Sequence, residues 1–167
     1  MAAMNNLQVA YYTLGSAVTI NMHGLADGAK AISDAIDNSV TRYTQAQIQV
    51  TFKTNQHSVD KAKGNVVFGL LRSVDGGLTY DSHLRPGNIL STIDDLDPNV
   101  PYTVSASTNL LGILPSFFKI SVGNRTGAPF FHKADKFSVS WIGIQILELT
   151  NNPASLMMGG PEWMGRV

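Results

Sequence analysis

The chain contains no cysteine and few charged residues. Its 167 residues include 0 Cys, 12 Lys+Arg and 12 Asp+Glu, which gives a formal net charge of +0. The missing cysteine excludes a disulfide framework, a thiolate zinc site and a cysteine nucleophile. The balanced charge removes the basic field on which non-specific nucleic-acid binding depends, so we expect no direct nucleic-acid partner.

Long apolar runs are also missing. No stretch approaches the roughly 18 apolar residues of a membrane span. The N-terminal segment, residues 1–16, lacks the positive region that opens a secretory signal peptide. We therefore expect no membrane partner and no signal peptide. The remaining composition, 44% hydrophobic and 8% aromatic, is typical of one globular domain.

The shortage of charge is concentrated at the two ends of the chain. Charged residues make up 14% of the sequence, against about 25% in an average domain. No charged side chain precedes Asp27, and Glu148 is the only one between Lys136 and Glu162. Protein interfaces are depleted in Lys, Asp and Glu and enriched in aromatic residues and Met. The pattern therefore predicts that both ends contact other protein.

The C-terminal segment, residues 151–167, is predicted to be an extended arm attached to a domain at residues 1–150. Its apolar residues follow no helix or strand period, and Gly159, Gly160 and Pro161 interrupt them. The arm either docks on another protein or packs on its own domain. The interface candidates are Tyr11, Tyr12, Leu156, Met157, Met158, Trp163 and Met164.

Strand patterns dominate the rest of the sequence. The clearest is residues 45–53, where apolar residues at even positions alternate with polar, nearly uncharged ones. Further strands are predicted at residues 7–14, 17–22, 66–72, 101–108, 117–122 and 137–149. Asp75-Gly76-Gly77 predicts a hairpin turn that returns at residues 78–80. Residues 29–36 fit either a helical turn or an extended segment, and we favour the extended one.

Two further patterns concern glycines in the C-terminal half of the chain. Gly123 to Gly127 is predicted to form the loop that ends the strand at residues 117–122. In the last strand the apolar face changes near Gly143. The change indicates a bulge there, or a strand buried on both sides with its second face covered by a neighbouring subunit. Short strands separated by turn residues, with no dependable long helix, predict an all-β fold, an antiparallel β-sandwich or jelly roll in one domain with extended terminal arms.

Candidate catalytic and metal-binding motifs are weak. Asp81-Ser82-His83 offers the residue types of a triad, but neighbours on a strand point to opposite faces, so a solvated loop is favoured. The segment from Asp94 to Asn99 imitates the start of a calcium loop without its glycine or its final glutamate. We therefore predict no enzyme activity, no catalytic or metal residues and no cofactor. Exposed rings such as Tyr80 or Tyr102 leave a carbohydrate-binding module as an alternative.

Several stretches resemble small structural proteins of tailed-bacteriophage virions. They are residues 25–33, 37–39, 45–53, 67–77 and 118–128, and together they span roughly residues 25–146. The resemblance implies a virion β-sandwich protein, assembled in the host cytoplasm, that coats the capsid as a decoration or cement protein or belongs to the tail. Its expected partners are copies of itself and another virion protein, the major capsid protein or a tail component. The C-terminal arm is not part of the resemblance.

Overall fold

The computed structural model describes residues 6–54, 64–97, 99–132 and 137–149, with side-chain burial from residue 16 to residue 145 within those ranges. The strands are β1 (Asn6–Ala17), β2 (Lys30–Ile32), β3 (Ile36–Asp37), β4 (Gln45–Lys53), β5 (Asn65–Ser73), β6 (Ile89–Ile93), β7 (Pro101–Ser107), β8 (Phe117–Arg125) and β9 (Ser138–Leu149). A short 3-10 helix, η1 (Thr108–Leu111), follows β7. No helix in the described part of the chain is long and apolar enough to cross a membrane.

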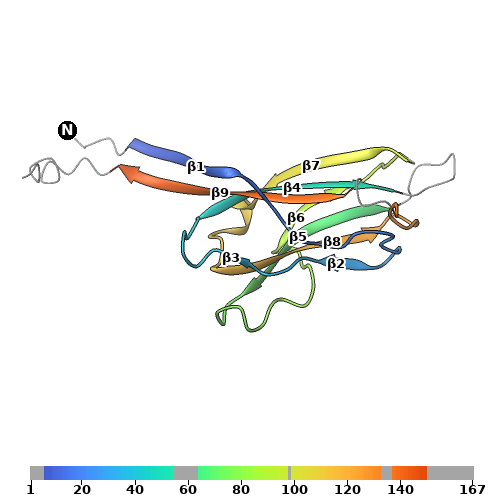
Figure 1. Ribbon diagram of the computed structural model, residues 1–167, viewed down its shortest axis with the longest axis horizontal. Coiled ribbons are helices and arrows are strands. Elements are labelled where there is room, and N and C mark those ends of the chain that lie inside the picture. Colours follow the sequence, from blue (N-terminus) through green and yellow to red (C-terminus); the bar gives the residue numbers. More distant parts are fainter. Residues whose placement is uncertain (1–5, 55–63, 98, 133–136, 150–167) are drawn as a thin grey trace, which may run out of the picture.

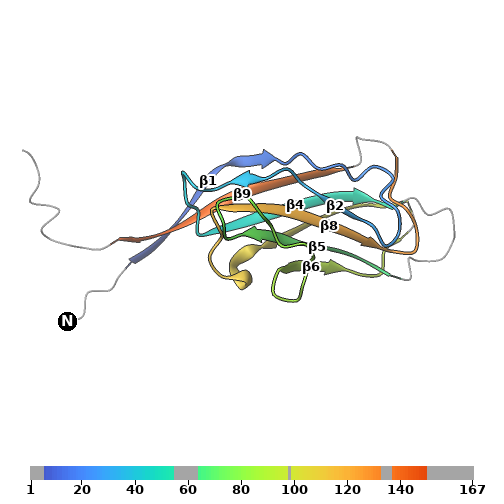
Figure 2. The same ribbon diagram turned by 90° about the horizontal axis from the view of Figure 1, so that it is seen from below.

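The strands form two antiparallel sheets packed face to face (Figures 1 and 2). One sheet has the order β1-β9-β4-β7, and the other has the order β2-β8-β5-β6 with β3 also paired to β8. The pairing is nested, because β1 pairs with β9, β2 and β3 with β8, β4 with β7, and β5 with β6. A chain paired in this way is a long hairpin folded over into a jelly roll. The predicted all-β sandwich is confirmed.

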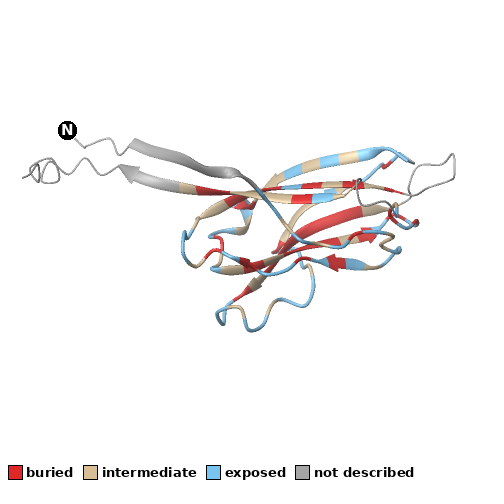
Figure 3. Ribbon diagram, viewed as in Figure 1, coloured by how far each residue is buried: buried red, intermediate tan, exposed pale blue. Residues whose placement is uncertain are grey.

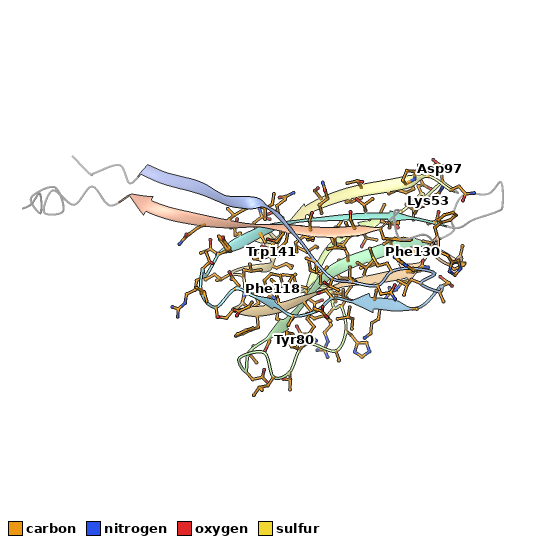
Figure 4. The ribbon with its side chains drawn as sticks, in the orientation of Figure 1. Lys53, Tyr80, Asp97, Phe118, Phe130 and Trp141 are labelled. Atoms are coloured by element: carbon orange, nitrogen blue, oxygen red, sulfur yellow. The ribbon has the colours of Figure 1, made fainter. Side chains whose placement is uncertain are left out.

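The core lies between the inner faces of the two sheets. In β4 the side chains of Ala46, Ile48, Val50 and Phe52 are fully buried, as their alternation with polar residues predicts. Aromatic contacts join the sheets, because the Trp141 ring meets the Phe118 ring edge-on at 5.5 Å (Figure 4). Such pairs contribute about 1 kcal/mol beyond the burial of their area.

The outer face of the second sheet is covered by residues 74–88, which connect β5 to β6. Leu71 points outward from β5 yet is 2% exposed. Leu84 and Asn88 lie so close over Gly69 that a Cβ there would meet Leu84 Cδ2 at 2.9 Å and Asn88 O at 2.2 Å. Figure 3 shows the result, since β5 is buried along nearly its whole length while β7 alternates between exposed and half-buried residues.

The predicted hairpin return at residues 78–80 is wrong. Asp75 instead folds the chain into a local turn, in which its carboxylate accepts hydrogen bonds from Ser73 Oγ at 2.8 Å and Thr79 N at 2.9 Å. The chain then crosses the sheet, and the partner of β5 is β6. The Asp75-Gly76-Gly77 segment does turn the chain, but the turn closes a tight loop and no strand follows it at residues 78–80.

The loop predicted at residues 123–127 is also placed too early. β8 continues to Arg125, and Gly123 pairs in the sheet with Val67 of β5 and Lys30 of β2. Asn124 faces inward, where its Nδ2 donates to Leu25 O and Ala128 O, both at 2.8 Å. The buried side chain of Asn124 therefore holds the turn after β8 from inside the protein. The composition had suggested a turn at the surface.

Gly143 has a different role from the one its sequence indicated. The register of β9 against β4 runs through Gly143 without a shift, and the irregularity lies in β1 between Tyr12 and Ser16. Gly143 faces the core, where the ring of Tyr43 leaves no room for a side chain: a Cβ would lie 2.2 Å from it. The prediction of a bulge in the last strand is therefore wrong.

Two predictions for the N-terminal third have opposite outcomes. Residues 17–22 do not form the predicted strand, because β1 ends at Ala17. The extended conformation predicted for residues 29–36 is confirmed by β2 and β3.

Candidate functional site

The outer face of the β9-β4-β7 sheet is polar and almost free of charge. The outward residues of β4 pair across the face with Ser105, Thr103 and Ser107 of β7 and with Ser138, Ser140 and Ile142 of β9. Lys53, at the end of β4, is the only charged side chain of these three strands up to Gln145. We call this surface the uncharged face. It consists of Gln45, Gln47, Gln49, Thr51, Thr103, Ser105, Ser107, Ser138, Ser140 and Ile142.

Side-chain hydrogen bonds tie neighbouring strands of the uncharged face together. Gln49 Nε2 donates to Ser105 Oγ at 3.3 Å, and the Thr51 and Thr103 hydroxyls are 3.0 Å apart. Gln49, Thr103 and Ser105 are exposed. The face therefore presents amides and hydroxyls that are already ordered, which lowers the entropy lost when another surface covers them.

A two-stranded ribbon projects from the same sheet, away from the sandwich (Figures 1 and 2). β4 begins at Gln45, opposite Ile144, so in the described chain β9 beyond Ile144 pairs with β1 alone, from Ala10↔Gln145 to Asn6↔Leu149. The paired segments contain one charged residue, Glu148. A two-stranded antiparallel ribbon is marginally stable in water, and its free edges are templates for further strand pairing.

Two of the predicted interface residues lie at the base of this ribbon. Tyr11 and Tyr12 pair through their backbones with Ile144 and Gly143, and their side chains lie outside the described burial. The other five candidates, Leu156, Met157, Met158, Trp163 and Met164, lie outside the described residues. Their role as an arm stays a prediction.

The two rings suggested for sugar stacking do not form a platform. Tyr102 turns into the sandwich, where its ring stacks on Phe52 at 5.7 Å and its hydroxyl accepts from Asp97 N at 2.5 Å. Tyr80 lies in the loop between β5 and β6 (Figure 4). Lys119 Nζ covers its ring at 4.4 Å from the ring centroid. Each ring thus already has a partner on one face.

In the Asp81-Ser82-His83 segment, the serine and the histidine are in contact but the aspartate is bound elsewhere. Ser82 Oγ and His83 Nδ1 are 2.8 Å apart, although adjacent residues on a strand could not meet in this way. They meet because residues 81–83 belong to a loop. The Asp81 carboxylate accepts from Arg72 N at 3.1 Å and not from His83, so it does not orient the imidazole as the third member of a triad would.

Other titratable groups are dispersed. In the described ranges no three His, Asp or Glu side chains come together in a way that could hold a metal ion. Asp95 and Asn99 adopt left-handed backbone angles, with φ of 57° and 58°, and between them Leu96 is fully buried. Within this segment, which imitates a calcium loop in sequence, Leu96 is anchored in the core.

Comparison with known proteins identifies no family. No family model matches the chain, and no curated protein matches it. A solved structure with a similar arrangement is the CBM22-1 xylan-binding domain of Xyn10C from Paenibacillus barcinonensis, with a TM-score of 0.35 and 8% sequence identity over 85% of this chain and 87% of that one. The likeness is too distant to transfer the ligand of that domain to this chain.

Proposed function

We propose that this chain is a non-enzymatic structural protein of a virion, a decoration or cement protein that associates with copies of itself and binds a capsid lattice. The observation that carries the proposal is the projecting ribbon, in which residues 145–149 of β9 pair only with β1 in the described chain. Such a ribbon is marginal alone and gains stability when another strand or surface covers its edges. A second copy supplies the same edges in a self-complementary arrangement.

The uncharged face supports the same proposal. Covering it requires no desolvation of carboxylates or ammonium groups, which costs several kcal/mol per ion. Its Gln, Ser and Thr groups can exchange water for the polar groups of a neighbouring subunit at little net cost. On a lattice, many copies held by weak contacts of this kind gain avidity.

The proposal is tested first through the oligomeric state of the full chain. Sedimentation velocity over a range of concentrations is expected to show self-association. Gln8→Pro removes a backbone N–H in the ribbon and should abolish association, whereas Gln8→Ala keeps the N–H and should leave it unchanged. Circular dichroism confirms that the sandwich stays folded. A chain that is monomeric at all concentrations, or a Gln8→Pro variant that associates as well as the native chain, overturns the proposal.

The virion assignment is tested separately by co-sedimentation with purified tailed-phage heads. The native chain is expected to sediment with the heads, and deletion of residues 151–167 should weaken this binding while the domain remains folded. If the truncated chain binds equally well, the arm does not take part. If the native chain associates with itself but binds no heads, self-assembly stands and the capsid role fails.

Carbohydrate binding is the second candidate, and the flat row of amides and hydroxyls on the uncharged face favours it. Gln47, Gln49 and Thr103 could hydrogen-bond the hydroxyls of an extended glycan chain laid across the strands. A glycan array distinguishes the two candidates. The carbohydrate function is favoured over assembly if the native chain is monomeric and binds a glycan on the array, and if Gln49→Ala abolishes that binding.

A further inference from the structure

A cleft opens on the other sheet, on the outer side of β2 and β8 beside the loop that covers β5. Its volume is about 380 Å³, and its walls include Lys30, His83, Ser121, Gly123 and Arg125. These residues come from β2, from the loop at residues 74–88 and from β8. The volume falls within the range of small-molecule sites, about 300–1,000 Å³.

The hollow exists because Gly123 has no side chain. Val122 and Asn124 are fully buried on the inner face, so position 123 faces outward, between Lys30 on β2 and Val67 on β5. Gly123 is not needed for a special backbone angle, since it is absent from the positive-φ glycines. A Cβ there would meet nothing nearer than Val67 O at 3.8 Å. The strand could hold a larger residue, and the glycine leaves the floor open.

The cleft is lined by cationic groups and by no carboxylate. Lys30 Nζ donates to Ser82 O at 2.5 Å, which holds the ammonium at the rim and leaves two of its three donors free. The side chain of Arg125 is exposed and makes no hydrogen bond or ion pair with any described residue. His83 is fixed through Nδ1 by Ser82 Oγ at 2.8 Å. The ammonium of Lys30, held at the rim, and the exposed guanidinium of Arg125, with no carboxylate in the lining, favour a negatively charged ligand.

The floor also contains a hydroxyl group. Ser121 is 1% exposed and lines the cleft, directly opposite Gly69, which has no side chain. A serine hydroxyl carries one O–H donor. Ser121 can therefore donate a hydrogen bond from the floor to a ligand in the cleft.

We propose that this cleft binds a small acid, an oxyanion group carried on a body about the size of a monosaccharide. Arg125 and Lys30 bind the oxyanion through charge-assisted hydrogen bonds, and the Ser121 hydroxyl donates from the floor. Leu84 and Val67 provide the apolar wall against which the body of the ligand packs. A carboxylate, a phosphate and a sulfate could each supply the oxyanion, and the experiment below distinguishes between them.

Isothermal titration calorimetry with the full chain tests the proposal, using glucuronate, glucose 6-phosphate, inorganic sulfate and neutral glucose as probes. At least one of the two sugar acids is expected to bind more tightly than glucose and sulfate. Arg125→Gln should weaken binding about tenfold or more. Gly123→Val fills the floor and should abolish binding, with the fold checked by circular dichroism.

Two control variants separate a built site from general attraction. Lys53→Gln and Arg42→Gln each remove one positive charge elsewhere and should leave the affinity unchanged. Sulfate bound as tightly as the sugar acids, with equal losses in Lys53→Gln and Arg125→Gln, means an adventitious ion only and overturns the proposal. Full binding by Gly123→Val overturns it as well, and so does binding of glucose that equals the binding of both sugar acids.

Discussion

The two sheets of this sandwich have opposite outer surfaces, although their inner surfaces are alike. The β9-β4-β7 face is bare, with Gln, Ser and Thr presented to solvent. The β2-β8-β5 face carries Lys30, Lys119 and Arg125 and is partly covered by residues 74–88. The low charge of the chain is therefore unevenly distributed over its surface. Charge is kept on one side, where a cleft is built, and left out of the other, where a partner surface is expected.

The largest expected effect concerns the covered side. Leu71→Ala removes an outward side chain that is 2% exposed, and large-to-small changes at buried positions cost about 2–5 kcal/mol. Thr103→Ala, at an outward position of the bare side, should change stability by less than about 1 kcal/mol. Urea denaturation measures both variants. An equal loss of unfolding free energy in both variants would show that the outer faces of the two sheets are buried to the same extent.

The next effect concerns charge on the bare side. The double variant Gln49→Lys, Ser105→Lys places two positive charges opposite each other on the uncharged face, and in a self-associated state they would be buried unpaired. Self-association should weaken about tenfold or more, since like charges at an interface cost several kcal/mol. Val74→Lys adds charge at a side chain that is 99% exposed and should have no effect. Unchanged sedimentation of the double variant would exclude this face from the contact.

A smaller effect is expected in the loop that covers the charged side. Hydrogen bonds from Thr79 Oγ1 and Thr79 N, then from Ser73 Oγ, lower the pKa of Asp75 from 3.8 to about 2. Because the folded pKa lies below the unfolded one, this stabilisation is complete above about pH 4 and is lost as the pH falls through about 2.

An NMR titration of the Asp75 carboxyl and the Thr79 amide measures this transition. Asp75→Asn should abolish it and loosen the turn at neutral pH. A carboxyl that titrates near its ordinary value would show that the turn does not hold it.

The smallest effect lies within the uncharged face. The Thr51 and Thr103 hydroxyls, 3.0 Å apart, form a cross-strand pair, and such pairs contribute about 0.2–1 kcal/mol. A double-mutant cycle with Thr51→Val and Thr103→Val should give a coupling energy in this range. A coupling of zero would mean that solvent competes fully for both hydroxyls.

The fold was predictable where one face of a strand is buried and the other is not. Residues 45–53 alternate so regularly that the predicted strand and β4 have the same bounds. Prediction failed where a residue is decided by a distant neighbour. Gly143 is required by the ring of Tyr43, a hundred positions earlier, and Asn124 is held by Leu25 O. Neither contact can be inferred from the residues that neighbour Gly143 or Asn124 in the sequence.

The candidate sites were predictable to different degrees. The polar, nearly uncharged side of residues 45–53 was visible in the sequence, and its pairing with β7 and β9 extends it to a face. The cleft was not visible, because Lys30, His83 and Gly123 come together only through the jelly-roll pairing. A glycine flanked two positions away by Ser121 and Arg125 in a strand is the one local signal that could have indicated it.

Nested pairing also sets the order in which the molecule can form. The innermost pair, β5 with β6, closes a short segment, whereas β1 must wait for β9, and long closures are slow to form. During synthesis the projecting ribbon therefore cannot form until β9 has left the ribosome. The proposed association through that ribbon would be delayed until after synthesis, so that unfinished chains do not join their neighbours.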